Sequence, residues 1–288
     1  MKNINIKERK FLFGLYIVST PIGNLADITF RAVEIIKKAD IVICENPKHS
    51  LKLLNNLGIK KKLVSLHDHN ETQVIKKIGL DLREKLVVLI SDSGSPLISD
   101  PGFKLVKYCI EKNIYITTLP GPSSIIPSLQ LSGLAMNEFV FLGFFPKEKK
   151  QIEVFIEKVK NSVFTTVFFV STHKIKKLLG IIGAKLENRS VSVVKEITKL
   201  NEKVFRGMGN EIGQLILKNK DNTKGEFVVV IEGKSSKKTG FIDLNKHNSL
   251  IKKMLIKFSL TDVVEIVHKI SGIKKNEVYK WVLSLKKF

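Results

Sequence analysis

The chain has 288 residues, of which 43% are hydrophobic and 8% aromatic, enough for two ordinary domains with buried cores. This composition excludes disorder as the main state of the chain. There are 49 lysines and arginines against 27 acidic residues, a net charge of +22, and only five of the basic residues are arginines. A charge of this size favours a polyanionic partner such as a nucleic acid. The plain alternative is a lysine-rich solvated surface.

The cysteine content and the N-terminal segment indicate the cellular compartment of the protein. Cys44 and Cys109 are too few for a disulfide framework or a cysteine-based zinc site, which predicts a reducing, cytoplasmic location. Basic residues before the apolar run 11–18 imitate a secretory signal, but the run ends in Ser-Thr-Pro-Ile-Gly without a small-residue cleavage site. We therefore interpret the run as a buried first strand. No apolar stretch reaches the ~20 residues of a membrane span, so no membrane partner is expected.

Short apolar runs alternate with segments of helical period along the first half of the chain. The expected strands are 15–20, 41–45, 63–67, 86–91, 115–119 and 139–144, and the expected helices are 28–38, 50–57, 71–85, 103–112 and 123–131. After a charged break at 146–150, a second series predicts helices at 152–160 and 174–182, and strands at 165–171, 190–197 and 226–231. Such repetition predicts an α/β fold with right-handed crossovers.

The pattern divides the chain into three parts and a linker. We predict α/β domains at 1–119 and 120–233, a linker at 234–240 and an all-helical tail at 241–288. The tail carries ten lysines against four acidic residues. With Thr261 as a helix N-cap and a turn at 271–273, it has a helix-turn-helix-like outline. Either RNA binding or a helical cap on the core is compatible with it.

Three loops rich in Pro, Gly, Ser and Asp follow predicted strands, at 19–24, 91–102 and 119–124. Ligands of open α/β sheets bind beyond the carboxyl ends of the strands, and glycine lets a ligand approach the backbone. No G-x-G-x-x-G follows the first strand and no P-loop is present, which disfavours classical dinucleotide and P-loop ligands. Ser93 and Ser95 do not form a G-x-S-x-G elbow, which disfavours a serine hydrolase.

Six motifs occur together in one order, at 16–29, 67–71, 91–102, 120–123, 196–199 and 224–227. They closely resemble the ribosomal RNA small subunit methyltransferase I family of the tetrapyrrole-methylase-like superfamily. The resemblance implies two α/β domains with a cofactor cleft between them. It also implies S-adenosyl-L-methionine-dependent 2′-O-methylation of a cytidine in the decoding region of small-subunit (16S) rRNA, on the 30S subunit, by a cytoplasmic homodimer.

The resemblance also implies roles for individual residues of this chain. It implies a cofactor pocket made by Pro21, Ser91, Asp92, Ser93, Gly94, Ile98, Ser123, Ser124, Phe169 and Val170. The chain departs from the family pattern at three places. Residues 45–48 are Glu-Asn-Pro-Lys instead of the usual Glu-Asp-Thr-Arg, and residues 170–174 are Val-Ser-Thr-His-Lys instead of Glu-Ser-Pro-His-Arg. Leu142 stands where a Glu is usual. Lysine cannot copy the forked donors of arginine.

These departures keep two other functions open. One is a ribosome-assembly RNA-binding protein that has the fold with weak or no turnover. The other is a tetrapyrrole methyltransferase, because the carboxylates of a tetrapyrrole would also suit a basic cleft.

Methyl transfer to a ribose hydroxyl needs the acceptor oxygen in line with the methyl group and a proton removed at or after attack. His69 and Glu71 are the first candidates for base and orienter, and His49 and Glu45 are the second. A His-x-His-x-Glu metal site and a helix-capping turn, with Asn70 as cap, are the alternatives; we expect no metal. Residues expected along the approach of substrate RNA are Lys48, His49, Lys52, Lys147, Lys149 and Lys150.

Overall fold

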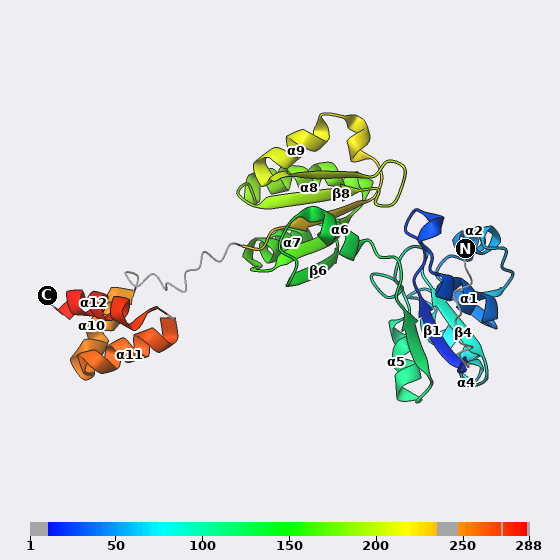
Figure 1. The fold of residues 1–288 in the computed structure, drawn as a ribbon, viewed down its shortest axis with the longest axis horizontal. Helices are drawn as coiled ribbons and strands as arrows, with labels where there is room; N and C mark the ends of the chain where they lie inside the picture. Colours follow the sequence, from blue (N-terminus) through cyan, green and yellow to red (C-terminus); the bar gives the residue numbers. More distant parts are fainter. Residues whose placement is uncertain (1–10, 235–246, 272, 287–288) are drawn as a thin grey trace, which may run out of the picture. The chain divides into compact units, whose positions relative to one another are not determined.

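The computed structural model describes residues 11–234, 247–271 and 273–286. The chain divides into two compact units, residues 1–234 and 235–288, and the first unit holds two five-stranded sheets (Figure 1). The basic residues before position 11, nearly all of the expected linker, and Gly272 of the expected turn lie outside the described residues. The domain limits 1–119 and 120–233 stay a prediction.

The first sheet is wholly parallel and has the order β3-β2-β4-β1-β5. Its strands are β1 (Gly14–Val18), β2 (Ile41–Cys44), β3 (Lys62–Ser65), β4 (Leu86–Ile90) and β5 (Ile116–Leu119). The central strands β1, β2 and β4 are almost completely buried, as expected for a sheet covered on both faces. This confirms the predicted α/β fold.

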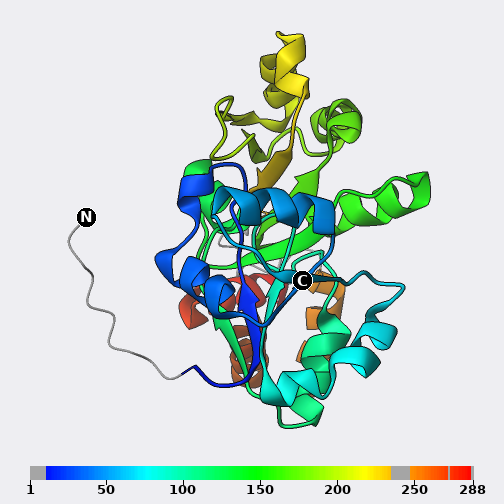
Figure 2. The same cartoon turned by 90° about the vertical axis from the view of Figure 1, so that its right-hand side faces the viewer.

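Alternate residues of these strands face two separate cores. Tyr16, Val42 and Val88 pack with α1 (Phe30–Lys38) and α2 (Pro47–Asn56) on one face. Leu15, Ile43 and Leu89 pack with α3 (Glu71–Ile78), α4 (Asp81–Glu84) and α5 (Phe103–Glu111) on the other face. In Figure 2 the blue helix α1 lies on one side of β1 and the cyan-to-green helices that follow β3 and β4 lie on the other.

The second sheet is mixed, with the order β6-β7-β10-β8-β9. Its strands are β6 (Phe139–Phe144), β7 (Thr165–Val170), β8 (Ser190–Lys195), β9 (Lys203–Met208) and β10 (Phe227–Ile231). On one face lie α7 (Lys149–Asn161), α8 (Thr172–Lys185) and α9 (Gly209–Leu217); α6 (Ile125–Ser132) packs on the other.

Three local expectations differ from the structure. The single helix expected at 71–85 is two helices, α3 and α4, separated by Gly79 and Leu80. At Gly79, Tyr108 of α5 approaches so closely that a Cβ would lie 2.7 Å from its hydroxyl. Strand β9 and helix α9 were not predicted. Lys149 and Lys150, expected in a charged break, form the first turn of α7.

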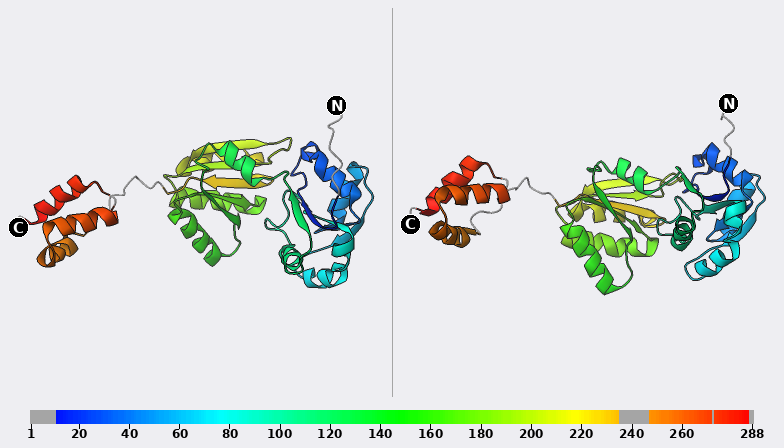
Figure 3. Two further views of the ribbon diagram at one scale, coloured as in Figure 1. Left: turned by 60° about the horizontal axis from the view of Figure 1, so that its bottom comes forward. Right: turned by 90° about the horizontal axis from the view of Figure 1, so that it is seen from below.

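The second unit is a bundle of α10 (Asn248–Lys257), α11 (Leu260–Ser271) and α12 (Lys275–Lys286), coloured orange to red in Figure 3. Buried Ile251, Val264 and Val278, one from each helix, belong to its own core. The helical tail is therefore confirmed, but Thr261 is not the N-cap of α11. The hydroxyl of Ser259 accepts from the Asp262 N–H at 3.2 Å instead. No helix of the described residues is long and apolar enough to cross a membrane.

Candidate functional site

The carboxyl ends of the five parallel strands meet at one edge of the first sheet. Strands β1 and β4 are neighbours, yet the helix after β1 lies on one face and the helix after β4 on the other. The two connections therefore diverge and leave a crevice between them, which is the usual ligand site of open α/β sheets. The candidate site is built around this crevice, from loops 19–24, 91–102 and 120–124.

Hydrogen bonds join the three loops to one another. Thr20 and Gly94 exchange two backbone bonds, of 2.9 and 3.0 Å, and the Thr20 hydroxyl donates to the Ser91 carbonyl at 3.1 Å. The hydroxyls of Ser19 and Ser95 lie 3.0 Å apart, and that of Ser95 also donates to the carbonyl of Pro122 at 3.3 Å. The three loops that the sequence singled out thus form one bonded frame.

Loop 19–24 is also anchored in the second sheet. Ile22 is 8% exposed and belongs to an apolar cluster with residues of α6, β7, β8, the loop after β8, and β10, namely Leu129, Val167, Val194, Ile197, Val228 and Val230. Gly23 lies directly against the loop after β8, where a Cβ would collide with Cγ of Lys199. The loop therefore joins the two sheets.

Three charged side chains, those of Glu196, Lys199 and Glu226, stabilise the segment against which Gly23 packs. Lys199 Nζ lies 3.1 Å from Glu196 Oε1 and 2.9 Å from Glu226 Oε2, and the Glu226 N–H donates to Glu196 Oε1 at 2.8 Å. Burial acts against ionisation of Glu196, but the Glu226 N–H and Lys199 lower its pKa. Burial likewise opposes the charge of Lys199, yet Glu226 and Glu196 raise its pKa. The sequence motifs at 196–199 and 224–227 thus meet in one ion-paired support.

Acidic side chains gather on the β2 and β4 sides of the crevice. Burial, Glu45 and Asp92 raise the pKa of Asp100 to about 6. Burial and the charges of Asp92 and Asp68 raise the pKa of Glu45, which His67 partly offsets. The three carboxylates 45, 92 and 100 are therefore close enough to disfavour full ionisation, and a cationic ligand would relieve their repulsion. Within the described ranges, no group of three or more His, Cys, Asp or Glu residues is placed to hold a metal ion.

A pocket of about 120 Å³ opens between loop 19–24 and helix α2. It is lined by Thr20, Pro21, Leu25, His49, Lys52, Leu53, Asn56 and Asp92. The pocket brings together Pro21 and Asp92, expected to bind the cofactor, and His49, expected near RNA. The Asn46 N–H donates to Asp92 Oδ1 at 3.3 Å, while its side chain caps α2 by accepting from the N–H groups of Lys48 and His49. Sequence reasoning did not select Asn56 or Leu25.

The remaining expected cofactor residues have different surroundings. Ser91 and Gly94 belong to the bonded frame, whereas Ser93 and Ile98 are exposed. Ser123 Oγ accepts from the Ile125 N–H at 3.3 Å, and Ser124 is the N-cap residue of α6. Phe169 packs edge-on against Phe144, with ring centroids 5.1 Å apart. Val170 is buried with α7 and α8, on the other face of the strand.

The basic positions expected near RNA are all at the surface: Lys48, His49, Lys52, Lys147, Lys149 and Lys150 are exposed. The family departures take part in packing. Leu142 packs against the core of the second sheet, and Lys174 Nζ donates to the Phe145 carbonyl at 2.6 Å. A lysine can make this single bond, so the forked geometry of an arginine is not needed for it.

The turn before α3 places its polar side chains in unlike environments. His69 is exposed, and its ring centroid lies 6.1 Å from that of His67. Glu71 is only 3% exposed, and its Oε1 accepts from the Leu105 N–H at 2.8 Å, so it satisfies an unpaired donor in the first turn of α5. Asn70 does not cap α3 with its side chain; it accepts from the His67 N–H and donates to the Ser65 carbonyl. The catalytic roles expected for Glu45, His69 and Glu71 stay predictions.

Comparison with known proteins agrees with this architecture. Residues 14–213 match the family model "Tetrapyrrole (Corrin/Porphyrin) Methylases". A crystal structure of uroporphyrin-III-C-methyltransferase from Thermus thermophilus superposes with a TM-score of 0.50 at 15% identity, covering 76% of this chain and 94% of that one. The fold and the family match therefore place the chain in the class of the tetrapyrrole methylases.

Sequence relatives narrow the class. Proteins named "Ribosomal RNA small subunit methyltransferase I" match from Escherichia coli O157:H7, at 36% identity over 93% of this chain and 94% of theirs, and from Halalkalibacterium halodurans, at 40% over 77% of each. The protein of that name from Buchnera aphidicola subsp. Schizaphis graminum is 38% identical over 94% of this chain and 96% of its own. The chain belongs to the ribosomal RNA small subunit methyltransferase I family, within the tetrapyrrole methylases.

The buried hydrogen bond of Glu71 predicts a cost in stability when it is removed. Glu71→Ala leaves the Leu105 N–H without its acceptor and should lower the free energy of unfolding by about 1–3 kcal/mol. His69→Ala, two residues away but exposed, is the matched control and should change it by less than about 0.5 kcal/mol. Urea titration of both variants measures the difference. An unchanged unfolding midpoint for Glu71→Ala would contradict the structural role.

Proposed function

We propose that the protein transfers a methyl group from S-adenosyl-L-methionine to the ribose 2′-oxygen of a cytidine in the decoding region of 16S rRNA, acting on the 30S subunit. We further propose that it works in the cytoplasm as a homodimer. The observation that carries the proposal is the bonded frame of loops 19–24, 91–102 and 120–124 at the switch point of the parallel sheet. The names of the relatives support the choice of rRNA as substrate.

The residues around the crevice fit a cationic cofactor. Asp92, Glu45 and Asp100 concentrate negative charge there in a chain of net charge +22. S-adenosylmethionine supplies a methyl group on a positively charged sulfur. Pro21, Gly94 and Ser123 come from three loops of one frame and would hold it, while exposed Ile98 and Ser93 would cover its outer side. Phe169 would limit the site on the second sheet.

For the transfer itself, we propose that His69 takes the proton of the 2′-hydroxyl, since it is exposed at the strand-end edge. Glu71 serves this role only indirectly, by fixing α5 against the turn that carries His69. Glu45 and His49 are the second candidates, because both belong to the α2 side of the crevice. Exposed Lys48, Lys147, Lys149 and Lys150 would attract the phosphates of the RNA.

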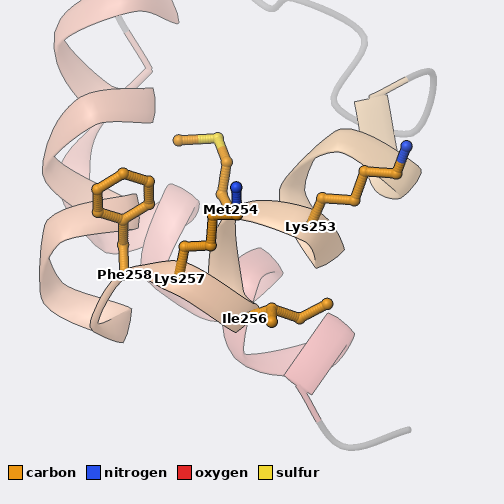
Figure 4. A pocket seen from close by; sticks show the side chains of 5 residues that line it. All are labelled: Lys253, Met254, Ile256, Lys257 and Phe258. Atoms are coloured by element: carbon orange, nitrogen blue, oxygen red, sulfur yellow. The ribbon is translucent and has the colours of Figure 1, made fainter.

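A second RNA contact is proposed for the helical unit. Its described residues carry eight lysines and three acidic residues. Figure 4 shows Lys253 and Lys257 on α10 beside Met254, Ile256 and Phe258, which line a pocket of about 280 Å³. Ile256 and Phe258 are 83% and 51% exposed. Lysines beside an exposed aromatic ring are typical of surfaces that bind single-stranded RNA.

Cofactor binding is tested without turnover. A ligand that binds only the folded state stabilises it by about 2.7 kcal/mol at a hundredfold excess over its Kd. S-adenosylmethionine, with its affinity first measured by calorimetry, should therefore raise the melting temperature. Asp92→Asn should weaken the binding, because it removes negative charge beside the site. Absence of both heat and thermal shift would exclude the methyltransferase and leave the RNA-binding alternative.

The position of the methyl group is tested on the product. A 2′-deoxy target nucleotide should abolish transfer and barely change phosphate-driven binding. The methylated linkage should resist alkali, because the 2′-oxygen can no longer attack the phosphate. A product that stays alkali-labile at the modified nucleotide would refute the sugar assignment. With the same assay, His69→Ala should lower turnover by about 10²–10⁴-fold and leave cofactor affinity unchanged; a loss below about threefold would remove the base role.

The helical unit is tested by truncation after Lys234, where the first compact unit ends. The salt dependence of RNA affinity becomes shallower when fewer lysines and arginines neutralise phosphates. Residues 1–234 should therefore bind 16S rRNA fragments with a shallower salt slope than the full chain, and S-adenosylmethionine with equal affinity. An identical salt slope would assign the unit a role in packing alone.

A further inference from the structure

Helix α2 presents one polar face on which the proposed function gives Asn56 no role and gives Lys52 no specific partner. Lys52 and Asn56 follow His49 by three and seven residues, so the three side chains lie on the same side of the helix. Ser50 and Leu54 are buried on the other side, in contact with the sheet. The helix is therefore held in place by its core side, and its polar face is positioned rigidly.

This face forms one wall of the pocket beside loop 19–24. Pro21 and Leu25 provide apolar surface opposite it, and Leu53 adds apolar surface between the walls. The pocket has a volume of about 120 Å³, below the ~300–1,000 Å³ of pockets for drug-sized ligands, so we expect it to take at most one ring system. Leu25 is 49% exposed, so an incoming ring would bury apolar surface that water now covers.

The polar groups of the pocket have free hydrogen-bonding capacity. Asn56 Nδ2 donates to the Lys52 carbonyl at 2.9 Å, and Asn56 Oδ1 accepts none of the hydrogen bonds found among the described residues. Lys52 takes part in none of the ion pairs of the described chain, although Asp92 lies on the same pocket. One amide acceptor and one ammonium group are therefore available to a ligand.

We propose that this pocket binds a single unpaired nucleotide of the substrate RNA, next to the one that is methylated. Its base would lie between α2 and the Pro21–Leu25 wall, with an exocyclic amino group donating to Asn56 Oδ1, and Lys52 would bind its phosphate. The inference rests on the proposed function and adds to it a second nucleotide site. Thr20 and Pro21 belong both to the pocket and to loop 19–24, so this nucleotide would lie beside the cofactor loops.

A base suits the pocket better than a free anion does. Asp92 places a carboxylate on the same surface as Lys52, which disfavours a small phosphate lying inside the pocket. A nucleotide can place its uncharged base inside and its phosphate at the outer end of the lysine side chain. Because the ring must leave its stack to enter, the substrate has to be locally single-stranded.

The test compares Lys52→Gln and Asn56→Leu with Lys37→Gln, which removes the same charge from an exposed position at the end of α1. All four proteins, including the parent, are assayed for melting temperature, S-adenosylmethionine affinity, binding of a fluorescent single-stranded 16S rRNA segment, and methyl transfer to 30S subunits. We expect Lys52→Gln and Asn56→Leu to lower RNA affinity and kcat/KM by about five- to fiftyfold, with cofactor affinity within twofold of the parent. Lys37→Gln should stay within about twofold of the parent throughout.

The two proposals fail in different ways. A parent protein that binds no cofactor and transfers no methyl group overturns the proposed function. A fully active parent, with Lys52→Gln and Asn56→Leu indistinguishable from Lys37→Gln in RNA affinity and kcat/KM, overturns the nucleotide pocket alone. The loss in Asn56→Leu should also depend on the base. With uracil in place of the amino-bearing base next to the target, the RNA affinity and kcat/KM of the parent should fall to those of the variant. Equal losses for parent and variant would refute the contact with Asn56.

Discussion

The candidate site depends on one short loop that belongs to both sheets. Loop 19–24 is bonded to loop 91–102 through Thr20 and Gly94, and it is anchored in the second sheet through Ile22. The close approach at Gly23 leaves no space for a side chain between the loop and Lys199. Because the loop is constrained from both sides, the residues of the crevice keep a fixed geometry without a ligand. Such preorganisation lowers the ordering cost of binding.

Charge is distributed unevenly around this loop. The chain as a whole is strongly basic, yet carboxylates 45, 92 and 100 gather beside the crevice, where burial and neighbouring negative charge raise the pKa values of Glu45 and Asp100. The exposed lysines expected near RNA lie on α2 and around the start of α7. Under the proposed function, the positively charged cofactor and the negatively charged RNA would each meet surface charge of the opposite sign.

The family departures are explained in part by local packing. Asn46, where the resemblance implies an acidic residue, caps α2, since an amide oxygen accepts from the same N–H groups as a carboxylate. Lys174, where the resemblance implies an arginine, bonds the Phe145 carbonyl, a contact that needs only one donor. Leu142 and Val170 lie in or against the apolar core, where a charged residue would need a partner. The residues at these four positions are therefore compatible with the fold. Methyl-transfer assays measure their effect on turnover.

The local features of this protein follow from the order of its residues. Alternating apolar runs and helical periods were enough to predict nearly all strands of both sheets, and Pro, Gly and Ser marked the three loops of the frame, because these signals depend on neighbouring residues. Strand β9 and helix α9 were missed. Long-range relations became visible only in the folded chain: Glu71 bonds the Leu105 N–H, Lys199 pairs with Glu226, and Asn56 and Leu25 line one pocket. An acidic residue before a helical segment has the same local pattern whether it is catalytic or buried. Its role is set by what lies across the fold, and periodicity carries no information about that.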